Sequence, residues 1–323
     1  MESSDVRNFR NFFEGVEKEV QKQVVGQDEI IRNILIAIIA GGSVLMEGAP
    51  GLGKTVMVKT FARVLDLPFS RIQFTPDLMP VDITGTYIVN KSESGLAFEF
   101  QEGPIFSSMI LADEINRATP KTQSAMLEAM QEKTVTVGRN TFRLPDPFFV
   151  LATQNPLEME GTYRLPEAQL DRFMFKLKIS LPSEKDIYRI LDVTVDRSEE
   201  PEIRKLACRE DILAWQNHAA QVPVAASVKE KAVRLMLETH PDRTSLSIVK
   251  EYVNCGASPR GLQAVLRGAR VRALAEGRFN ASFEDVAKMA YPALRHRIFL
   301  NFKASAEKVD ADVILDEILR RIK

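Results

Sequence analysis

The sequence predicts an α/β fold in which a parallel sheet, covered by helices on both faces, precedes an all-α region. Short apolar runs that alternate with helical segments are typical of strands buried on both faces. Strand signals end near residue 184, whereas helical spacing continues. Hydrophobic residues make up 45% of the chain and charged residues 27%, as in ordinary globular proteins. Because 323 residues exceed the usual size of one domain, we expect two, spanning residues 1–184 and 185–323.

Each element follows from its pattern. Two helices are predicted before the sheet, over residues 6–23 and 28–40, and the glycine pair at 41–42 ends the second. The predicted strands cover residues 43–47, 69–74, 108–112, 148–153 and 173–179. Two hairpins, over residues 86–100 and 133–144, interrupt the sheet, with turns at Ser92-Glu93-Ser94-Gly95 and Gly138-Arg139-Asn140. The later helices are predicted over residues 187–195, 209–221, 227–239, 246–254, 261–276 and 283–291.

Charge and hydropathy exclude several classes of function. The 43 basic and 44 acidic residues leave a formal charge of −1, so nothing draws the whole chain to nucleic acid or an anionic membrane. The apolar stretch at residues 34–40 is too short to span a bilayer, and no secretory signal pattern precedes it. We therefore expect a cytoplasmic protein with no nucleic-acid partner and no membrane span.

A complete phosphate-binding loop joins the first predicted strand to a helix. Its residues are Gly48, Ala49, Pro50, Gly51, Leu52, Gly53, Lys54 and Thr55, and Val56 follows in the helix. This spacing lets backbone N–H groups surround a β-phosphate at the positive end of the helix. Lys54 is expected to reach the β- and γ-phosphates, and the Thr55 hydroxyl to ligate Mg²⁺. ATP and Mg²⁺ are thus the predicted ligands.

Polar residues follow two further apolar strands. Asp113 and Glu114 come directly after the third strand, and Asn155 follows the fourth. Since ligands bind at the carboxyl edge of an open α/β sheet, all three are expected beside the loop. Asp113 is predicted to hold the Mg²⁺ shell, Glu114 to act as general base for the attacking water, and Asn155 to sense the γ-phosphate.

With these residues in place, the chain resembles the MoxR family of AAA+ ATPases over about residues 10–300. The motifs that carry the resemblance are Val25-Gly26-Gln27, Leu111 to Ala118, Ala152-Thr153-Gln154-Asn155-Pro156, Gly161-Thr162-Tyr163, Leu165-Pro166-Glu167-Ala168, Leu170-Asp171-Arg172-Phe173 and Ser258-Pro259-Arg260-Gly261. The resemblance implies an AAA+ P-loop module with a five-stranded sheet in the order 5-1-4-3-2, two hairpin insertions and a helical lid.

The resemblance also implies roles for residues that no local pattern identifies. Such proteins form rings, usually hexamers, with each nucleotide between neighbouring subunits. Arg172 is then the candidate arginine finger, acting in trans, and Arg164 a second candidate. Arg260 matches the sensor-2 position at the start of a lid helix, and Val25, Gly26 and Gln27 match the adenine pocket. An ordinary ion pair of Arg172 with Asp171 or another local carboxylate is the alternative for that residue.

The function implied is ATP-driven, chaperone-like remodelling or maturation of protein complexes, often with a partner that carries a von Willebrand factor A domain. Two alternatives are a nucleotide-gated scaffold that hardly turns over and a chelatase-like motor subunit. The segment Leu294-Arg295-His296-Arg297 also resembles one in relatives, and a solvated basic turn is the default reading.

Overall fold

A five-stranded parallel sheet forms the centre of the molecule. The computed structural model describes residues 3–92, 95–155, 162–195 and 201–322. The strands are β1 (Val44–Glu47), β2 (Phe69–Gln73), β5 (Met109–Asp113), β8 (Phe149–Gln154) and β9 (Phe175–Lys178). They lie in the order β2-β5-β8-β1-β9 and pair in parallel. Numbered along the chain, this is the predicted order 5-1-4-3-2.

Both faces of the sheet are buried, which explains the continuous apolar runs of the strands. Successive side chains of a strand point to opposite faces. Accordingly, Met109 and Leu111 belong to one hydrophobic core, whereas Ile110 and Ala112 belong to a second core on the other face. A strand with one solvated face would alternate apolar and polar residues instead.

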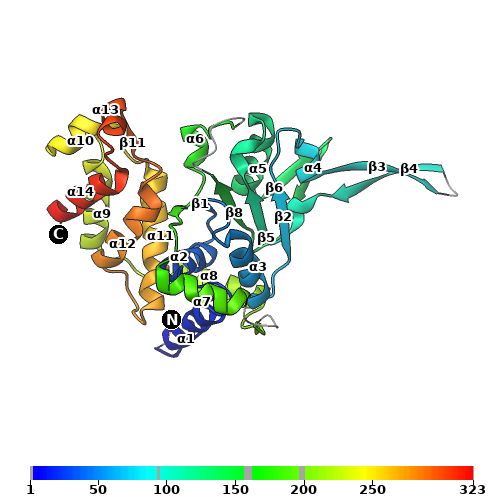
Figure 1. Ribbon diagram of the computed structural model, residues 1–323, viewed down its shortest axis with the longest axis horizontal. Helices are drawn as coiled ribbons and strands as arrows, with labels where there is room; N and C mark the ends of the chain where they lie inside the picture. Colours follow the sequence, from blue (N-terminus) through cyan, green and yellow to red (C-terminus); the bar gives the residue numbers. More distant parts are fainter. Residues whose placement is uncertain (1–2, 93–94, 156–161, 196–200, 323) are drawn as a thin grey trace.

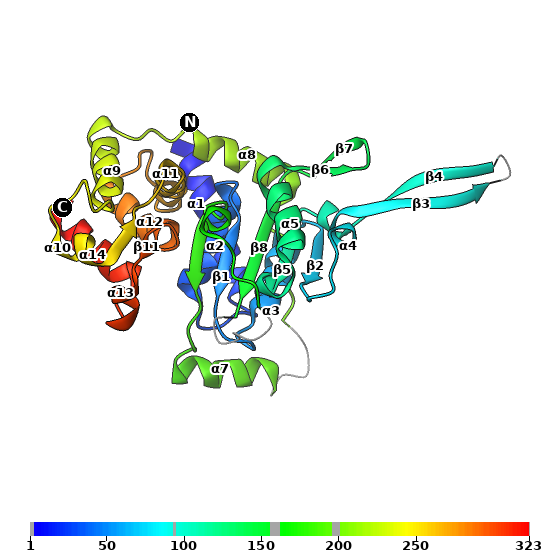
Figure 2. The same ribbon diagram turned by 90° about the horizontal axis from the view of Figure 1, so that it is seen from above.

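Helices cover the two faces unequally (Figures 1 and 2). The larger core includes side chains of α1 (Ser3–Val20), α2 (Asp28–Ile39), α3 (Lys54–Val64), α8 (Arg209–Ala220) and α11 (Pro259–Ala275). The smaller core is closed by α4 (Pro80–Thr84) and α5 (Pro120–Glu132), with the short 3-10 turns η1 (Pro104–Phe106) and η2 (Ile115–Arg117).

Both predicted hairpins are present. The first consists of β3 (Gly85–Ser92) and β4 (Gly95–Glu102), and it extends from the body as a long arm (Figure 2). Residues 93 and 94 of its predicted turn lie outside the described residues. The second consists of β6 (Thr134–Val137) and β7 (Asn140–Arg143). The rings of Phe100 and Phe142 stack at 4.1 Å and join the two hairpins at their bases.

The region after the sheet is helical, as predicted. Beyond α6 (Glu167–Leu170), it contains α7 (Glu184–Thr194), α8, α9 (Ala226–Glu238), α10 (Ser247–Tyr252), α11, α12 (Phe283–Leu294), α13 (Phe302–Ala306) and α14 (Ala311–Ile322). A short antiparallel ladder between β10 (Val253–Cys255) and β11 (Phe299–Leu300) was not predicted. With three and two residues, these strands are too short to show a period.

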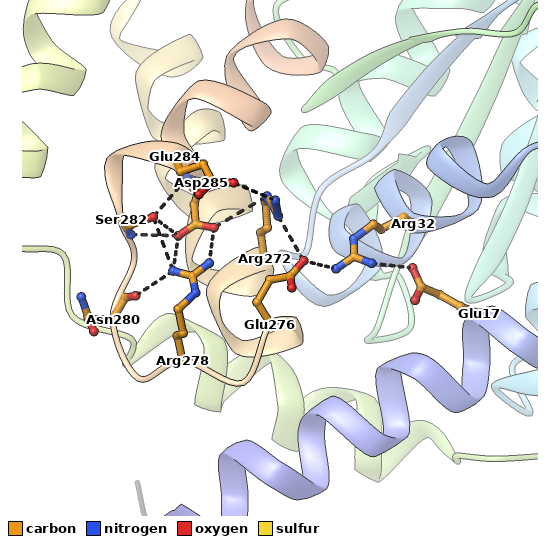
Figure 3. A network of polar contacts seen from close by, with 9 residues as sticks. All are labelled: Glu17, Arg32, Arg272, Glu276, Arg278, Asn280, Ser282, Glu284 and Asp285. Atoms are coloured by element: carbon orange, nitrogen blue, oxygen red, sulfur yellow. Dashed lines mark hydrogen bonds and ion pairs between the residues drawn. The ribbon is translucent and has the colours of Figure 1, made fainter. Parts of the chain in front are cut away.

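Charged side chains fasten the helical region to the N-terminal helices (Figure 3). Arg32 of α2 pairs with Glu276, which caps α11, at 2.6 Å, and with Glu17 of α1 at 3.5 Å. In the loop between α11 and α12, Arg278 donates two hydrogen bonds of 2.6 and 2.7 Å to the buried carboxylate of Asp285. These contacts and the continuous core link α11 and α12 to the helices that begin the chain.

Candidate functional site

The glycine loop joins β1 to α3, as predicted, and its backbone explains its glycines. Gly51 and Gly53 adopt positive φ angles of 81° and 75°, which favour glycine. A Cβ atom on Gly48 would lie 2.7 Å from Cγ2 of Ile179, so the chain passes too closely there for a side chain. Close packing therefore requires glycine at the start of the loop, and backbone conformation favours glycine at Gly51 and Gly53.

Lys54, the first residue of α3, turns its ammonium group back to the loop. Nζ donates a 2.7 Å hydrogen bond to the carbonyl oxygen of Gly48. Burial lowers the pKa of Lys54, and the nearby carboxylates of Asp113 and Glu114 oppose that shift. The lysine is thus positioned between the loop and two carboxylates at the end of β5.

A cavity of about 290 Å³ opens at this carboxyl edge of the sheet. Its walls are formed by Pro50, Gly51, Gly53, Lys54, Thr55, Val56, Arg71, Gln73, Asp113, Glu114 and Asn155. Most of the predicted phosphate and metal residues therefore share one cavity. Gly48, Ala49 and Leu52 belong to the loop but do not line the cavity.

The two carboxylates are held by the neighbouring strand β8. Thr153 Oγ1 donates to Oδ1 of Asp113 at 2.6 Å and accepts the backbone N–H of Glu114 at 2.9 Å. Glu114 has a positive φ of 56°, which turns the chain sharply at the end of β5. Asn155, 6% exposed, follows β8 on the same side of the cavity.

Two residues of this cavity, Arg71 and Gln73 on β2, were missed by the sequence analysis. Arg71 Nη2 lies 2.8 Å from Oδ2 of Asp113, and Gln73 Nε2 donates to Oε2 of Glu114 at 2.9 Å. Because β2 pairs with β5, Gln73 stands opposite Asp113. Both residues are polar and lie at alternate positions near the end of a predicted strand. Together with the expected strand order, this pattern could have indicated that they reach the site.

The donor set of the cavity is compatible with Mg²⁺. The Thr55 hydroxyl and the Asp113 carboxylate line the same space. Mg²⁺ in nucleotide sites takes one or two protein oxygens and completes its shell with phosphates and water. Among the described residues, no group of three or more His, Cys, Asp or Glu side chains could hold a metal ion. These residues therefore form no metal site from such side chains alone.

The predicted adenine-pocket turn lies behind the loop. Gln27 Nε2 donates to the carbonyl oxygen of Ser180 at 3.2 Å, next to Ile179, against which Gly48 packs. Gly26 has a φ of 75°, and a Cβ atom there would lie 2.7 Å from the Cβ atom of Asp186 in α7. Val25 is buried, at 8% exposure. The turn and the end of β9 are therefore adjacent, outside the cavity that contains Lys54.

Arg172 and Arg260 lie at the opposite edge of the sheet. They line a second cavity of about 330 Å³ together with Gly42, Phe148 and Arg267. Gly42, Phe148 and Arg172 each precede a strand, so this cavity is at the amino edge, whereas the loop is at the carboxyl edge. The structure thus brings the two predicted arginines together, but not to the glycine loop of their own chain.

Asp171 does not pair with Arg172. Its Oδ1 atom accepts a 2.6 Å hydrogen bond from Nε of Arg297 instead. Within the described part of the chain, the guanidinium of Arg172 has no hydrogen-bond or ion-pair partner. The alternative of a local ion pair with Asp171 is therefore wrong. Arg164 is exposed and lines neither cavity.

Two of the predicted motifs fall partly outside the described residues. Pro156 and Gly161 lie in the stretch 156–161, between Asn155 and Thr162.

In the ranges that are described, no helix is long and apolar enough to cross a membrane.

Comparisons with known proteins agree with this geometry. Residues 43–175 match the model of the ATPase family associated with various cellular activities (AAA), and residues 245–318 match the AAA lid domain. Chaperone MoxR1 of Mycobacterium tuberculosis is 41% identical over 94% of this chain and 80% of its own. Protein MoxR of Methylorubrum extorquens is 32% identical over 88% of this chain and 86% of its own.

A solved structure also resembles the whole fold. The crystal structure of a candidate ATPase from Cytophaga hutchinsonii superposes with a TM-score of 0.92 at 41% identity. The match covers 99% of this chain and 97% of the other. The strand order and the helical region described above are thus shared with this relative along its length.

Proposed function

This chain belongs to the MoxR family of AAA ATPases, and on that premise we propose that it hydrolyses ATP with Mg²⁺ between copies of itself to remodel protein complexes. As a member of this ATPase family it binds ATP. The finer assignments below are argued from the placement of its residues.

The carboxyl-edge cavity supplies the part of the site that comes from one subunit. The loop backbone and Lys54 would hold the phosphates, while Thr55 and Asp113 would hold Mg²⁺. A metal held there would supply charge neutralisation for the transferring phosphoryl group. Glu114 would orient and deprotonate the attacking water, and Asn155 would contact the γ-phosphate from the neighbouring strand.

The observation that carries the proposal is the position of Arg172 and Arg260. Both line the amino-edge cavity, and the glycine loop opens at the other edge of the sheet. Neither therefore completes the nucleotide site of its own chain in this arrangement. In a head-to-tail ring, the amino edge of one subunit faces the carboxyl edge of the next, so both arginines would act in trans.

A closed ring also accounts for the incomplete site of one chain. Heterologous interfaces form rings when the rotation between subunits closes. We propose a ring of six subunits, which is not needed for ATP binding but is required for hydrolysis. An arginine supplied in trans raises hydrolysis rates by about 10³ to 10⁵.

Remodelling is the proposed use of this turnover. It is supported by the name of the relative MoxR1, a chaperone, which is 41% identical to this chain. A cytoplasmic location of this chain, a partner bearing a von Willebrand factor A domain and a protein client are proposed with it. A nucleotide-gated scaffold and a chelatase-like motor subunit are the competing functions, and turnover and stimulation by partners separate them.

Steady-state phosphate release tests the enzymatic part. Lys54→Ala and Arg172→Ala are expected to abolish turnover, whereas Lys59→Ala, an exposed lysine of the same helix, should keep it. Turnover that survives both changes would refute the proposed site. A pull-down with Glu114→Gln protein and ATP tests remodelling, and recovery of no protein client together with stimulation of turnover by DNA would contradict it.

A further inference from the structure

The edge of the sheet beside Arg172 is covered by the segment that follows α12. Strand β9 pairs with β1 on one side only, and an open strand edge presents unpaired backbone groups. Three consecutive side chains, Arg295, His296 and Arg297, turn toward this edge. Arg295 Nη1 lies 3.4 Å from the carbonyl oxygen of Lys176, and His296 Nε2 lies 3.1 Å from that of Phe173. The segment is thus no solvated basic turn.

His296 acts in this contact as a neutral donor. Burial lowers its pKa well below the usual value of 6.5, and the charge of Arg297 lowers it further. Since a carbonyl oxygen can only accept, Nε2 carries the proton. His296 therefore anchors the segment to the residues that precede β9 without adding a charge to the core.

Arg297 makes the most extensive contact of the three. Its side chain is 3% exposed, and its five N–H groups all donate. Besides Oδ1 of Asp171, they reach the carbonyl oxygens of Asp171 at 2.8 Å, Phe173 at 2.7 Å, Met174 at 3.1 Å and Ala293. One buried guanidinium thus holds the backbone on both sides of Arg172.

The same cluster holds the start of α11, which carries Arg260. Ser258, the N-cap residue, makes no capping hydrogen bond with its side chain. Its hydroxyl instead donates to the carboxylate of Asp171 at 3.2 Å. Gly261 fits closely against Arg297, because a Cβ atom there would lie 2.8 Å from Cδ of Arg297. Asp171 and Arg297 therefore contact the neighbours of both Arg172 and Arg260.

We propose that Arg297 is a positioning residue of the intersubunit site: through Asp171 and Ser258 it holds Arg172 and Arg260 as one rigid pair that meets the nucleotide of the next subunit. The inference rests on the proposed function, in which these two arginines act in trans. It adds that their spacing is set by a third arginine, which lines the same cavity, is 3% exposed and acts on the pair through its contacts with Asp171 and the backbone.

The consequence for catalysis is geometric. A guanidinium stabilises charge on the transferring phosphoryl group only where it is preorganised, and a displacement of about 1 Å can cost roughly 100-fold in rate. A lysine at position 297 keeps a positive charge beside Asp171, but its single ammonium cannot reach all five acceptors. The two arginines would then lose their common support while the subunit keeps its own ATP cavity.

Mixed rings test the inference. Arg297→Lys alone is expected to lower kcat roughly 10- to 100-fold, with the KM for ATP changed less than about twofold. Ser258→Ala alone is expected to lower kcat about two- to tenfold. Each is then assembled with Glu114→Gln subunits, whose own sites are inactive but whose arginines are intact. Turnover should rise clearly above the sum of the separate proteins, because a variant site now receives its arginines from a normal neighbour.

Arg172→Ala mixed with Glu114→Gln is the reference for the trans role itself. Arg295→Lys is the matched control, because Arg295 binds β9 and Asp312 but not Asp171, and its kcat should stay near that of the wild type. If Arg172→Ala is rescued and Arg297→Lys is not, Arg297 serves only the fold of its own subunit and the inference is overturned. Unchanged kcat in Arg297→Lys overturns it as well. If Arg172→Ala is not rescued, the trans role and the inference both fall.

Discussion

Gln73 on β2 donates a 2.9 Å hydrogen bond to Oε2 of Glu114, the proposed general base at the end of the neighbouring strand. Arg117 approaches the same oxygen at 3.0 Å. Glu114 is thus held from two sides, and its orientation depends on residues outside its own motif. A base that must aim at one water molecule is sensitive to such neighbours.

Gln73→Glu is therefore expected to inhibit hydrolysis at neutral pH and to restore it partly as the pH rises. Two carboxylates within hydrogen-bond distance tend to share a proton, and a protonated base cannot activate water. The measurement is the pH dependence of kcat, whose acid limb should move to higher pH. Gln73→Ala removes the bond without adding charge, and the same displacement in that variant would refute the explanation.

Arg71 is expected to weaken the binding of Mg²⁺ and so to raise the Mg²⁺ concentration that turnover requires. It lies 2.8 Å from Oδ2 of Asp113, the proposed metal residue, and repels a cation that approaches this oxygen. The Arg71 side chain is 46% exposed, so the effect should be small. Arg71→Ala should lower the Mg²⁺ concentration for half-maximal turnover by roughly two- to fivefold.

A magnesium titration of phosphate release provides the measurement. Arg10→Ala, which removes an exposed arginine paired with Glu14 on α1, serves as the control and should leave the titration unchanged. Chelation with EDTA should stop turnover in each protein. A higher magnesium requirement in Arg71→Ala would contradict the idea that Arg71 and Mg²⁺ compete for Asp113.

Arg172→Lys is expected to lose most turnover, about 10³-fold, as Arg172→Ala should. A compact ammonium cannot form the planar, two-pronged contact that a guanidinium makes with a phosphoryl group. Arg164→Lys is the comparison, because Arg164 is exposed and lines neither cavity. Single-turnover hydrolysis measures both, and a larger loss for Arg164→Lys would make that residue the main trans arginine.

Asp285 is expected to stabilise the helical region in a pH-dependent way (Figure 3). Burial acts to raise its pKa, but hydrogen bonds from Arg278 and Ser282 outweigh this, so the pKa lies below the ordinary 3.8. A lowered pKa in the folded state means that the stabilisation is present above about pH 4 and is lost as the pH falls through the lowered value.

Urea unfolding of Asp285→Asn checks this expectation. The variant should lose about 1–3 kcal/mol at pH 7, less than the roughly 3–5 kcal/mol of a fully buried pair, because Arg278 is 38% exposed. The difference from the wild type should shrink below about pH 4. Glu284→Gln, at a side chain that is 75% exposed, should show little change at either pH. A difference that grows toward acid would have the wrong sign.

The fold and the carboxyl-edge part of the site could be predicted, because the sequence patterns that indicate them involve residues close together in the chain. The glycine loop uses backbone groups of consecutive residues, so its spacing alone places Lys54 and Thr55. Asp113 and Asn155 end apolar strands, and parallel strands bring their carboxyl ends to one edge. The predicted helices and strands followed from periodicity, with boundaries that differ by a few residues from those observed, whereas the helices α4, α5, α6, α13 and α14 were not predicted.

The division at residue 184 stays a prediction, and so do the roles assigned to the individual site residues. The positions of those residues, in contrast, are seen in the structure. Sequence resemblance suggested Arg172 and Arg260 separately, one in each predicted domain, and did not indicate that they share a cavity. They share a cavity only because the helical region packs against β9, which the sequence pattern does not show.

The sequence by itself thus determined the sheet, the phosphate loop and the chemistry of its carboxyl edge, since each depends on residues close together in the chain. Only the tertiary structure decided that Arg71 and Gln73 hold the two carboxylates, and that Arg297 binds the backbone on both sides of Arg172. The reason is physical: a buried guanidinium is satisfied by carbonyl groups that any residue can supply. Arg297 and Asp171 are 126 positions apart, and no local pattern records which carbonyls the fold brings to such a side chain.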